Sequence, residues 1–128
     1  KWTVRTIGYS SRMHLLLQCA DAVVARPGTG TTSEAILCGC PVIFNIIGGP
    51  MPQEMITMRF FREHNWPSPV GRASSLPDRV TYWMSHRTHL EKARKVMRNV
   101  QPNGHPIEII RLLRELAEDS PNRQAEPS

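Results

Sequence analysis

The chain has 128 residues, of which 40% are hydrophobic, 21% charged and 6% aromatic. This length and balance allow one domain with a buried core, and they exclude a disordered chain, a collagen-like chain and a disulfide-stapled miniprotein. The three cysteines match no zinc or redox spacing, so we expect Cys19, Cys38 and Cys40 to be reduced, small, buried side chains. No segment approaches the roughly 18 to 20 apolar residues of a membrane span.

The net charge of +5 is concentrated in the middle of the chain. Residues 59–99 hold nine basic and three acidic side chains, a local charge of +6. Such a stretch favours an anionic lipid surface or a nucleic acid, and a solvated helical face is the simpler alternative for most of these charges. No aromatic residues alternate with the basic ones, which argues against nucleic-acid binding.

The first half of the chain alternates between strand-like and helix-like segments. Apolar or β-branched runs predict strands at residues 2–7, 22–25 and 41–46. Helical spacing predicts helices at residues 12–20, 32–38 and 53–64. Ser11 is expected to cap the first helix, and Gly39 is expected to end the second in the left-handed region. The third carries Ile56, Phe60 and Phe61 on one side. The alternation predicts βαβ units and a parallel sheet.

The second half is predicted to be helical after a brief extended piece at residues 66–70. Helices are expected to start near Ser75 and Thr88, because each is followed three residues later by an acid, as in a capping box. A third helix is expected from Pro106. From Asp119 the chain is polar, so we expect a domain at residues 1–118 and a mobile tail at residues 119–128.

A glycine-rich loop at residues 26–31 joins the second strand to the second helix. The free amides and the dipole of such a helix start suit an anion, and Gly28 and Gly30 would let a phosphate approach the backbone. The threonine hydroxyls would add donors, at Thr29, Thr31 and Thr32. Without a P-loop lysine or a G-x-G-x-x-G run, a Walker-type ATPase and a dinucleotide fingerprint are disfavoured. An ordinary strand–turn–helix explains the same spacing.

Three further polar residues each allow two interpretations. Glu34 can accept hydrogen bonds from a ribose diol, or it can close a capping box with Thr31. Gln53 and Glu54 together offer donors and acceptors to sugar hydroxyls, or they form a solvated helix start.

Two histidines, His86 and His89, lie three residues apart, but no third ligand is near in sequence, so a metal site there is disfavoured.

Taken together, these segments resemble the C-terminal, donor-binding domain of GT-B glycosyltransferases of family 28. That family includes monogalactosyldiacylglycerol synthases, processive diacylglycerol glucosyltransferases and the N-acetylglucosaminyltransferase that makes lipid II. The resemblance covers about residues 4–117 and is nearest to the monogalactosyldiacylglycerol synthases. Its specific core is ADAVVARPGTGTTSEAILCGCPVIFN, residues 20–45, followed by Pro52-Gln53-Glu54.

The resemblance implies a Rossmann-like α/β fold, a parallel sheet flanked by helices with a helical C-terminal segment, incomplete at its N-terminus. It implies a UDP-sugar as substrate, with no metal and no cofactor. The implied roles are diphosphate binding by the loop of Gly28 and by the backbone of Thr29, Gly30 and Thr31, ribose binding by Glu34, uracil contact at the Tyr9–Ser10 turn, and hexose contact by Gln53 and Glu54. For Glu34, the resemblance favours the ribose interpretation over the capping box.

The implied reaction is inverting transfer of a hexose, galactose or glucose, from the UDP-sugar to a lipid acceptor such as diacylglycerol. The implied partners are the lipid acceptor, an anionic membrane surface and an N-terminal acceptor domain in cis or in trans, with no nucleic acid. The catalytic base is expected in that domain, so this chain alone is expected to be inactive. The implied location is peripheral, on the cytoplasmic face of a membrane or the plastid envelope.

Two alternatives to this interpretation stay open. In the first, the chain is the donor-binding subunit of a split glycosyltransferase. In the second, it is part of an epimerase that has the same scaffold and acts on UDP-N-acetylglucosamine. The residues immediately upstream of Lys1 would distinguish both alternatives from the lipid glycosyltransferase that the resemblance implies.

Overall fold

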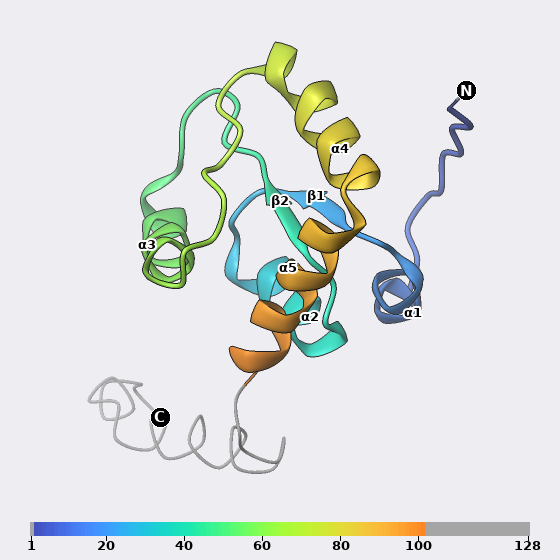
Figure 1. The fold of residues 1–128 in the computed structure, drawn as a ribbon, viewed down its shortest axis with the longest axis horizontal. Helices are drawn as coiled ribbons and strands as arrows, with labels where there is room; N and C mark the ends of the chain where they lie inside the picture. Colours follow the sequence, from blue (N-terminus) through green and yellow to red (C-terminus); the bar gives the residue numbers. More distant parts are fainter. Residues whose placement is uncertain (1, 102–128) are drawn as a thin grey trace, which may run out of the picture.

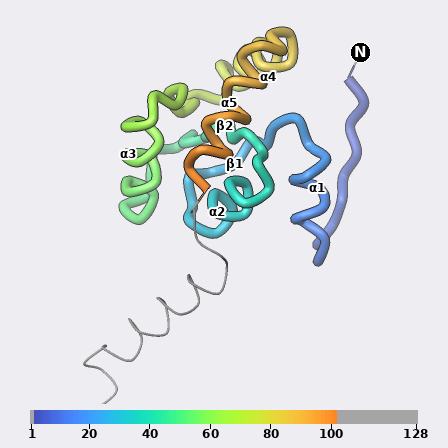
Figure 2. The backbone as a smooth tube through the Cα atoms, turned by 60° about the horizontal axis from the view of Figure 1, so that its bottom comes forward, coloured from blue at the N-terminus to red at the C-terminus, as the bar shows by residue number. Residues whose placement is uncertain are grey.

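A computed structural model describes residues 2–101, and within them the chain forms a mixed α/β fold (Figures 1 and 2). In chain order its elements are α1 (Met13–Cys19), β1 (Val23–Ala25), α2 (Thr29–Cys38), β2 (Val42–Phe44), the 3₁₀ turn η1 (Pro52–Glu54), α3 (Met55–Glu63), the 3₁₀ turn η2 (Ala73–Ser75), α4 (Leu76–Ser85) and α5 (Arg87–Asn99). The helix predicted from Pro106 and the tail predicted from Asp119 lie outside the described residues.

The two strands form a parallel pair joined by α2, which is the βαβ unit that the sequence predicts. Val23 pairs with Val42 and Ala25 pairs with Phe44. All three residues of β2 are buried, as expected for a wholly apolar run inside an α/β fold. On the far side of β2, the extended piece around Val70 continues the pairing through a parallel bridge to Asn45.

An aromatic chain of edge-to-face contacts ties the C-terminal helices to the sheet. Phe44 of β2 contacts Phe61 of α3, with ring centroids 4.8 Å apart, and the series continues through Trp66 to Trp83 of α4. The Trp66 indole N–H donates a 2.9 Å hydrogen bond to the carbonyl of Val42. In Figure 1, α3 and α1 lie on opposite sides of the sheet, and α5 runs from α4 back toward α2.

The strand predicted at residues 2–7 is wrong. These residues are extended but exposed, with Val4 85% and Trp2 71% accessible, and they form no ladder with the strands that the structure describes. Figure 1 shows them projecting away from the start of α1. A β-branched run becomes a strand only where a neighbour satisfies its amides and carbonyls, and β1 and β2 pair with each other instead.

The second helix begins earlier than the sequence suggests. Gly28 is the residue before α2, and its carbonyl accepts a 3.1 Å hydrogen bond from the amide of Thr32, so residues 29–31 form the first turn of the helix. Gly39 ends the helix at φ 64°, as predicted.

Several predicted caps and buried positions are also wrong. Ser10, not Ser11, accepts a hydrogen bond near the start of α1, from the amide of Arg12 at 3.1 Å. Neither Ser75 nor Thr88 makes a side-chain cap, because α4 follows a 3₁₀ turn and α5 begins at Arg87. Cys19, which we expected to be buried, is exposed, whereas Cys38 is half-buried and Cys40 is buried. Of the three apolar residues on one side of the third predicted helix, Phe61 is buried, and Ile56 and Phe60 are exposed.

Candidate functional site

The loops that follow β1 and β2 open on the same edge of the sheet, because the strands are parallel. Ligands of open α/β sheets bind at this carboxyl edge. Residues 26–28 leave β1 there and lead into α2, and residues 45–54 leave β2 there and lead into α3. The candidate site is therefore built from these two loops, the start of α2 and the turn that precedes α1.

Arg26 holds the two loops together. Its guanidinium makes a bidentate pair with Glu54, with Nε–Oε1 and Nη2–Oε2 distances of 2.9 Å. The same group donates to the carbonyls of Ile47, at 3.0 Å, and Gly49, at 2.7 Å. The second loop is thus fixed at three points to the end of β1.

Glu54 faces into the protein at the start of α3. Its residue exposure is 4%, and its Oε2 also accepts a 2.9 Å hydrogen bond from the amide of Met51. The hydrogen bond from Arg26 is the main reason that the pKa of the Glu54 carboxyl lies below its ordinary value, and it also raises the pKa of Arg26. The solvated-helix interpretation is therefore wrong for Glu54, although Gln53 beside it is exposed.

The start of α2 presents open backbone. By helix geometry the amides of residues 29–31 lack acceptors within the helix. Gly28 has φ −75°, a value that any residue adopts, and a Cβ placed on Gly28 or Gly30 would meet no atom within 4 Å. Neither the backbone nor the surrounding residues that the structure describes require glycine at these two positions. The open space above them is free for a ligand.

A groove of about 530 Å³ brings together residues that are far apart in sequence. Its lining includes Ser10, from the turn before α1, and Thr31 and Glu34, on the first turns of α2. The capping alternative for Glu34 is wrong, because Gly28 precedes the helix and Thr31 lies inside it. The Glu34 carboxylate is exposed and enters no ion pair with the residues described here.

The predicted site residues thus fall into three groups. Ser10, Thr31 and Glu34 line the groove. Gly28, Thr29 and Gly30 form the start of α2 and do not line it, and Gln53 and Glu54 belong to the loop that Arg26 holds and do not line it either. Arg26 itself was not singled out by the sequence argument. The sequence does show that Arg26 is a charged residue directly after a wholly apolar strand. It does not show the partner of Arg26, because Glu54 is 28 residues away and the two form no local pattern.

Both histidines of the second half pack against aromatic rings. The His86 ring stacks on Tyr82 with centroids 4.0 Å apart, and His89 packs edge-on against Tyr82 at 5.4 Å and against Trp83 at 5.1 Å. Residues 2–101 contain no group of three or more His, Cys, Asp or Glu side chains able to hold a metal ion. None of the helices in that range is both long enough and apolar enough to cross a bilayer.

Comparison with known proteins shows that the chain is similar to lipid glycosyltransferases. It is 29% identical over 98 residues to the processive diacylglycerol beta-glucosyltransferase of Bacillus licheniformis, a match that covers 76% of this chain and 25% of that enzyme. The enzyme of the same name from Bacillus subtilis is 26% identical over a match of the same length and the same coverage. The monogalactosyldiacylglycerol synthase 3, chloroplastic, of Arabidopsis thaliana is 33% identical over 45 residues, which are 35% of this chain and 10% of that protein.

The chain therefore spans about a quarter of the length of the diacylglycerol glucosyltransferases that it matches. No protein-family model matches the chain. No solved structure matches it either. The sequence identities are low, and they support the expectation that the chain is related to glycosyltransferases.

Proposed function

We propose that this chain is the nucleotide-sugar-binding part of a UDP-sugar-dependent glycosyltransferase that transfers a hexose to a lipid acceptor such as diacylglycerol. The observation that carries the proposal is the groove in which Ser10, Thr31 and Glu34 meet beside the start of α2. Its chemistry suits a nucleoside diphosphate, and the similarity to the lipid glycosyltransferases supports the class of donor.

In this proposal the first turn of α2 binds the diphosphate. The amides of Thr29, Gly30 and Thr31 point out of a ten-residue helix, at the positive end of its dipole. The absent side chains of Gly28 and Gly30 leave room for phosphate oxygens. When the sugar is transferred, negative charge develops on the departing diphosphate, and fixed amides stabilise that charge without reorganisation.

Glu34 binds the ribose of the donor in this proposal. A carboxylate accepts hydrogen bonds from two neighbouring hydroxyls, and Glu34 is exposed on the groove, one turn along α2 from the amides assigned to the diphosphate. Backbone groups of the Tyr9–Ser10 turn meet the uracil. The Ser10 hydroxyl is already engaged by the Arg12 amide, which keeps this turn in place.

The loop held by Arg26 contacts the hexose in this proposal. Gln53 is exposed and offers both a donor and an acceptor. Glu54 keeps one unused acceptor position on Oε1, because that oxygen accepts only from Arg26 in the residues described. The acceptor-binding domain and the catalytic base are supplied in cis or in trans, and the assembled enzyme works at a membrane surface.

The experiment is a titration of the chain with UDP, followed by calorimetry or by amide chemical shifts. Glu34→Gln is expected to weaken binding about tenfold, because a charge-assisted hydrogen bond contributes about 1.5–3 kcal/mol. Glu91→Gln, an exposed acid on α5, is the matched control and is expected to bind as the wild type does.

A second ligand identifies the hydroxyls. UDP lacking the ribose 2′-hydroxyl is expected to bind the wild type less tightly and to remove most of the difference between the wild type and Glu34→Gln. Equal affinity of the wild type and Glu34→Gln for UDP would rule out the ribose role.

A further inference from the structure

His14 lies in the groove that holds Glu34, and the function proposed above gives it no part. It is the second residue of α1, and it lines the groove of about 530 Å³ together with Ser10, Thr31 and Glu34. Its side chain is exposed. The imidazole is therefore accessible to a molecule that enters the groove.

A contact between α1 and α2 brings His14 to the face of α2 that carries Glu34. Cys38 follows Glu34 by four residues, so the two side chains lie on the same face of α2, one turn apart. The Cys38 thiol donates to the carbonyl of His14, with an Sγ–O distance of 3.6 Å. Helical side chains lean toward the N-terminus of their helix, so those of His14 and Glu34 both extend from this contact toward the groove that they line.

Both ring nitrogens of His14 are free. The rings of His64 and His86 each bond through Nδ1 to the backbone carbonyl four residues earlier, at 2.8 Å. His14 has no helical carbonyl at that position, because α1 begins at Met13. Within residues 2–101 its ring makes no hydrogen bond, and it forms no ion pair with Glu34. A ligand that binds both side chains therefore breaks no existing ion pair.

The two side chains complement each other toward a pair of neighbouring hydroxyls. An ionised carboxylate only accepts hydrogen bonds, so Glu34 can accept from both hydroxyls of a ribose but cannot donate to their oxygens. A neutral imidazole carries one N–H donor and one acceptor nitrogen. His14 thus supplies the donor that Glu34 lacks, and a hydroxyl that contacts both residues is matched at its proton and at its oxygen.

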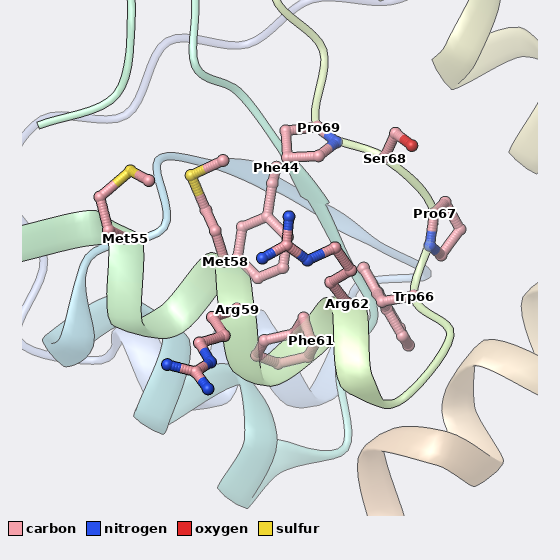
Figure 3. A pocket seen from close by; sticks show the side chains of 10 residues that line it. All are labelled: Phe44, Met55, Met58, Arg59, Phe61, Arg62, Trp66, Pro67, Ser68 and Pro69. Carbon is pink, nitrogen blue, oxygen red and sulfur yellow. The ribbon is translucent and has the colours of Figure 1, made fainter.

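The apolar groove beside α3 offers no such combination (Figure 3). It has a volume of about 220 Å³, and Figure 3 shows the rings of Phe44 and Trp66 in its lining. The lining includes Arg59 and Arg62 but neither a carboxylate nor an imidazole. The combination of groups that suits a ribose diol is therefore found in the groove formed by α1 and α2.

We propose that His14 is a second ribose-binding residue, whose imidazole N–H donates to the oxygen of a ribose hydroxyl that itself donates to Glu34. The inference deepens the proposed function and rests on it, because it takes the ligand of the groove to be a UDP-sugar. A nucleotide without these hydroxyls leaves both side chains without partners, so the pair favours ribonucleotides over their deoxy analogues.

The first test is calorimetric titration of the full chain with UDP. His14→Ala is expected to weaken binding about fivefold, because one hydrogen bond is lost. His14→Gln keeps an N–H donor and is expected to bind within about twofold of the wild type. The matched control is Gln18→Ala, which removes an exposed side chain one turn further along α1, outside the groove, and is expected to bind as the wild type does. Equal affinities of His14→Ala and Gln18→Ala, with unchanged circular dichroism in both, would overturn the inference.

The second test uses UDP that lacks both ribose hydroxyls. The wild type and His14→Ala are expected to bind this ligand with the same affinity, because the group that His14 contacts is absent from it. A deficit of His14→Ala that persists with this ligand would place His14 on the uracil or the diphosphate and would also overturn the inference.

The variants of Glu34 separate this inference from the proposed function. Glu34→Gln with His14→Ala is expected to lose less affinity for UDP than the product of the two single losses, because both residues bind the same hydroxyls. Single losses that multiply in full would contradict a shared hydroxyl. A wild type that does not bind UDP would remove the proposed function and this inference together. UDP binding that weakens in Glu34→Gln and is unchanged in His14→Ala would remove this inference alone.

Discussion

Arg26 and Glu54, 28 residues apart, form a bidentate ion pair that joins the end of β1 to the start of α3. Both partners do more than neutralise each other. Arg26 also binds two carbonyls of the loop between them, and Glu54 binds the amide of Met51. The pair therefore sets the course of the loop that carries Gln53.

Replacing Arg26 with leucine is expected to destabilise the chain, because it leaves the carboxylate of Glu54 buried without its partner. We expect the fall in the thermal midpoint to be about twice or more that of Arg94→Leu, which breaks the exposed pair with Asp21. Thermal unfolding followed by circular dichroism measures both. Equal shifts in the two variants would mean that the Arg26 pair is an ordinary surface contact.

The same pair is expected to make stability fall on acidification. The pKa of Glu54 in the folded chain lies below its ordinary value of 4.5, so its contribution is present above that pH and is lost as the pH falls through the lower folded value. Glu54→Gln is expected to flatten the acid side of the stability curve. Urea unfolding of both proteins over a pH series tests this, and parallel acid limbs would contradict it.

Gly30→Ala is expected to separate stability from ligand binding. Alanine has open space at this position in the first turn of α2, so the free energy of unfolding is expected to rise by about 0.5–1 kcal/mol. Its methyl group would stand beside the amides assigned to the diphosphate, so UDP affinity is expected to fall by about tenfold.

The control for this variant is Gly39→Ala. It places a side chain at φ 64° and is expected to destabilise the chain. Unchanged UDP binding in Gly30→Ala would argue against the α2 amides as the diphosphate site.

The cysteines are expected to differ in reactivity. Burial raises the pKa of the Cys40 thiol to about 11, and Cys40 is 1% exposed, whereas Cys19 is exposed. An aromatic disulfide reagent at neutral pH is therefore expected to modify Cys19 first and Cys40 only after unfolding. Cys19→Ser should remove the fast phase. A fast phase that survives in Cys19→Ser would show that one of the other thiols is accessible.

Local patterns were sufficient for the central unit of the fold. The apolar runs that became β1 and β2 are short, uninterrupted and separated by a helix-length segment, and Gly39 ends that segment as predicted. Such features depend on backbone preferences within a few residues. The family resemblance in the sequence likewise rested on contiguous residues, chiefly residues 20–45.

Only the tertiary structure decided what depends on distant partners. Residues 2–7 have strand-forming side chains but no neighbour to pair with in residues 2–101, so they stay exposed. The sequence left open that Glu54 is part of a solvated helix start, and its ion pair with Arg26, 28 residues away, excludes this. Ser10 and Glu34 share a groove because α1 packs on α2. Pairing, burial and convergence are properties of residues far apart in the chain, and no local pattern contains them.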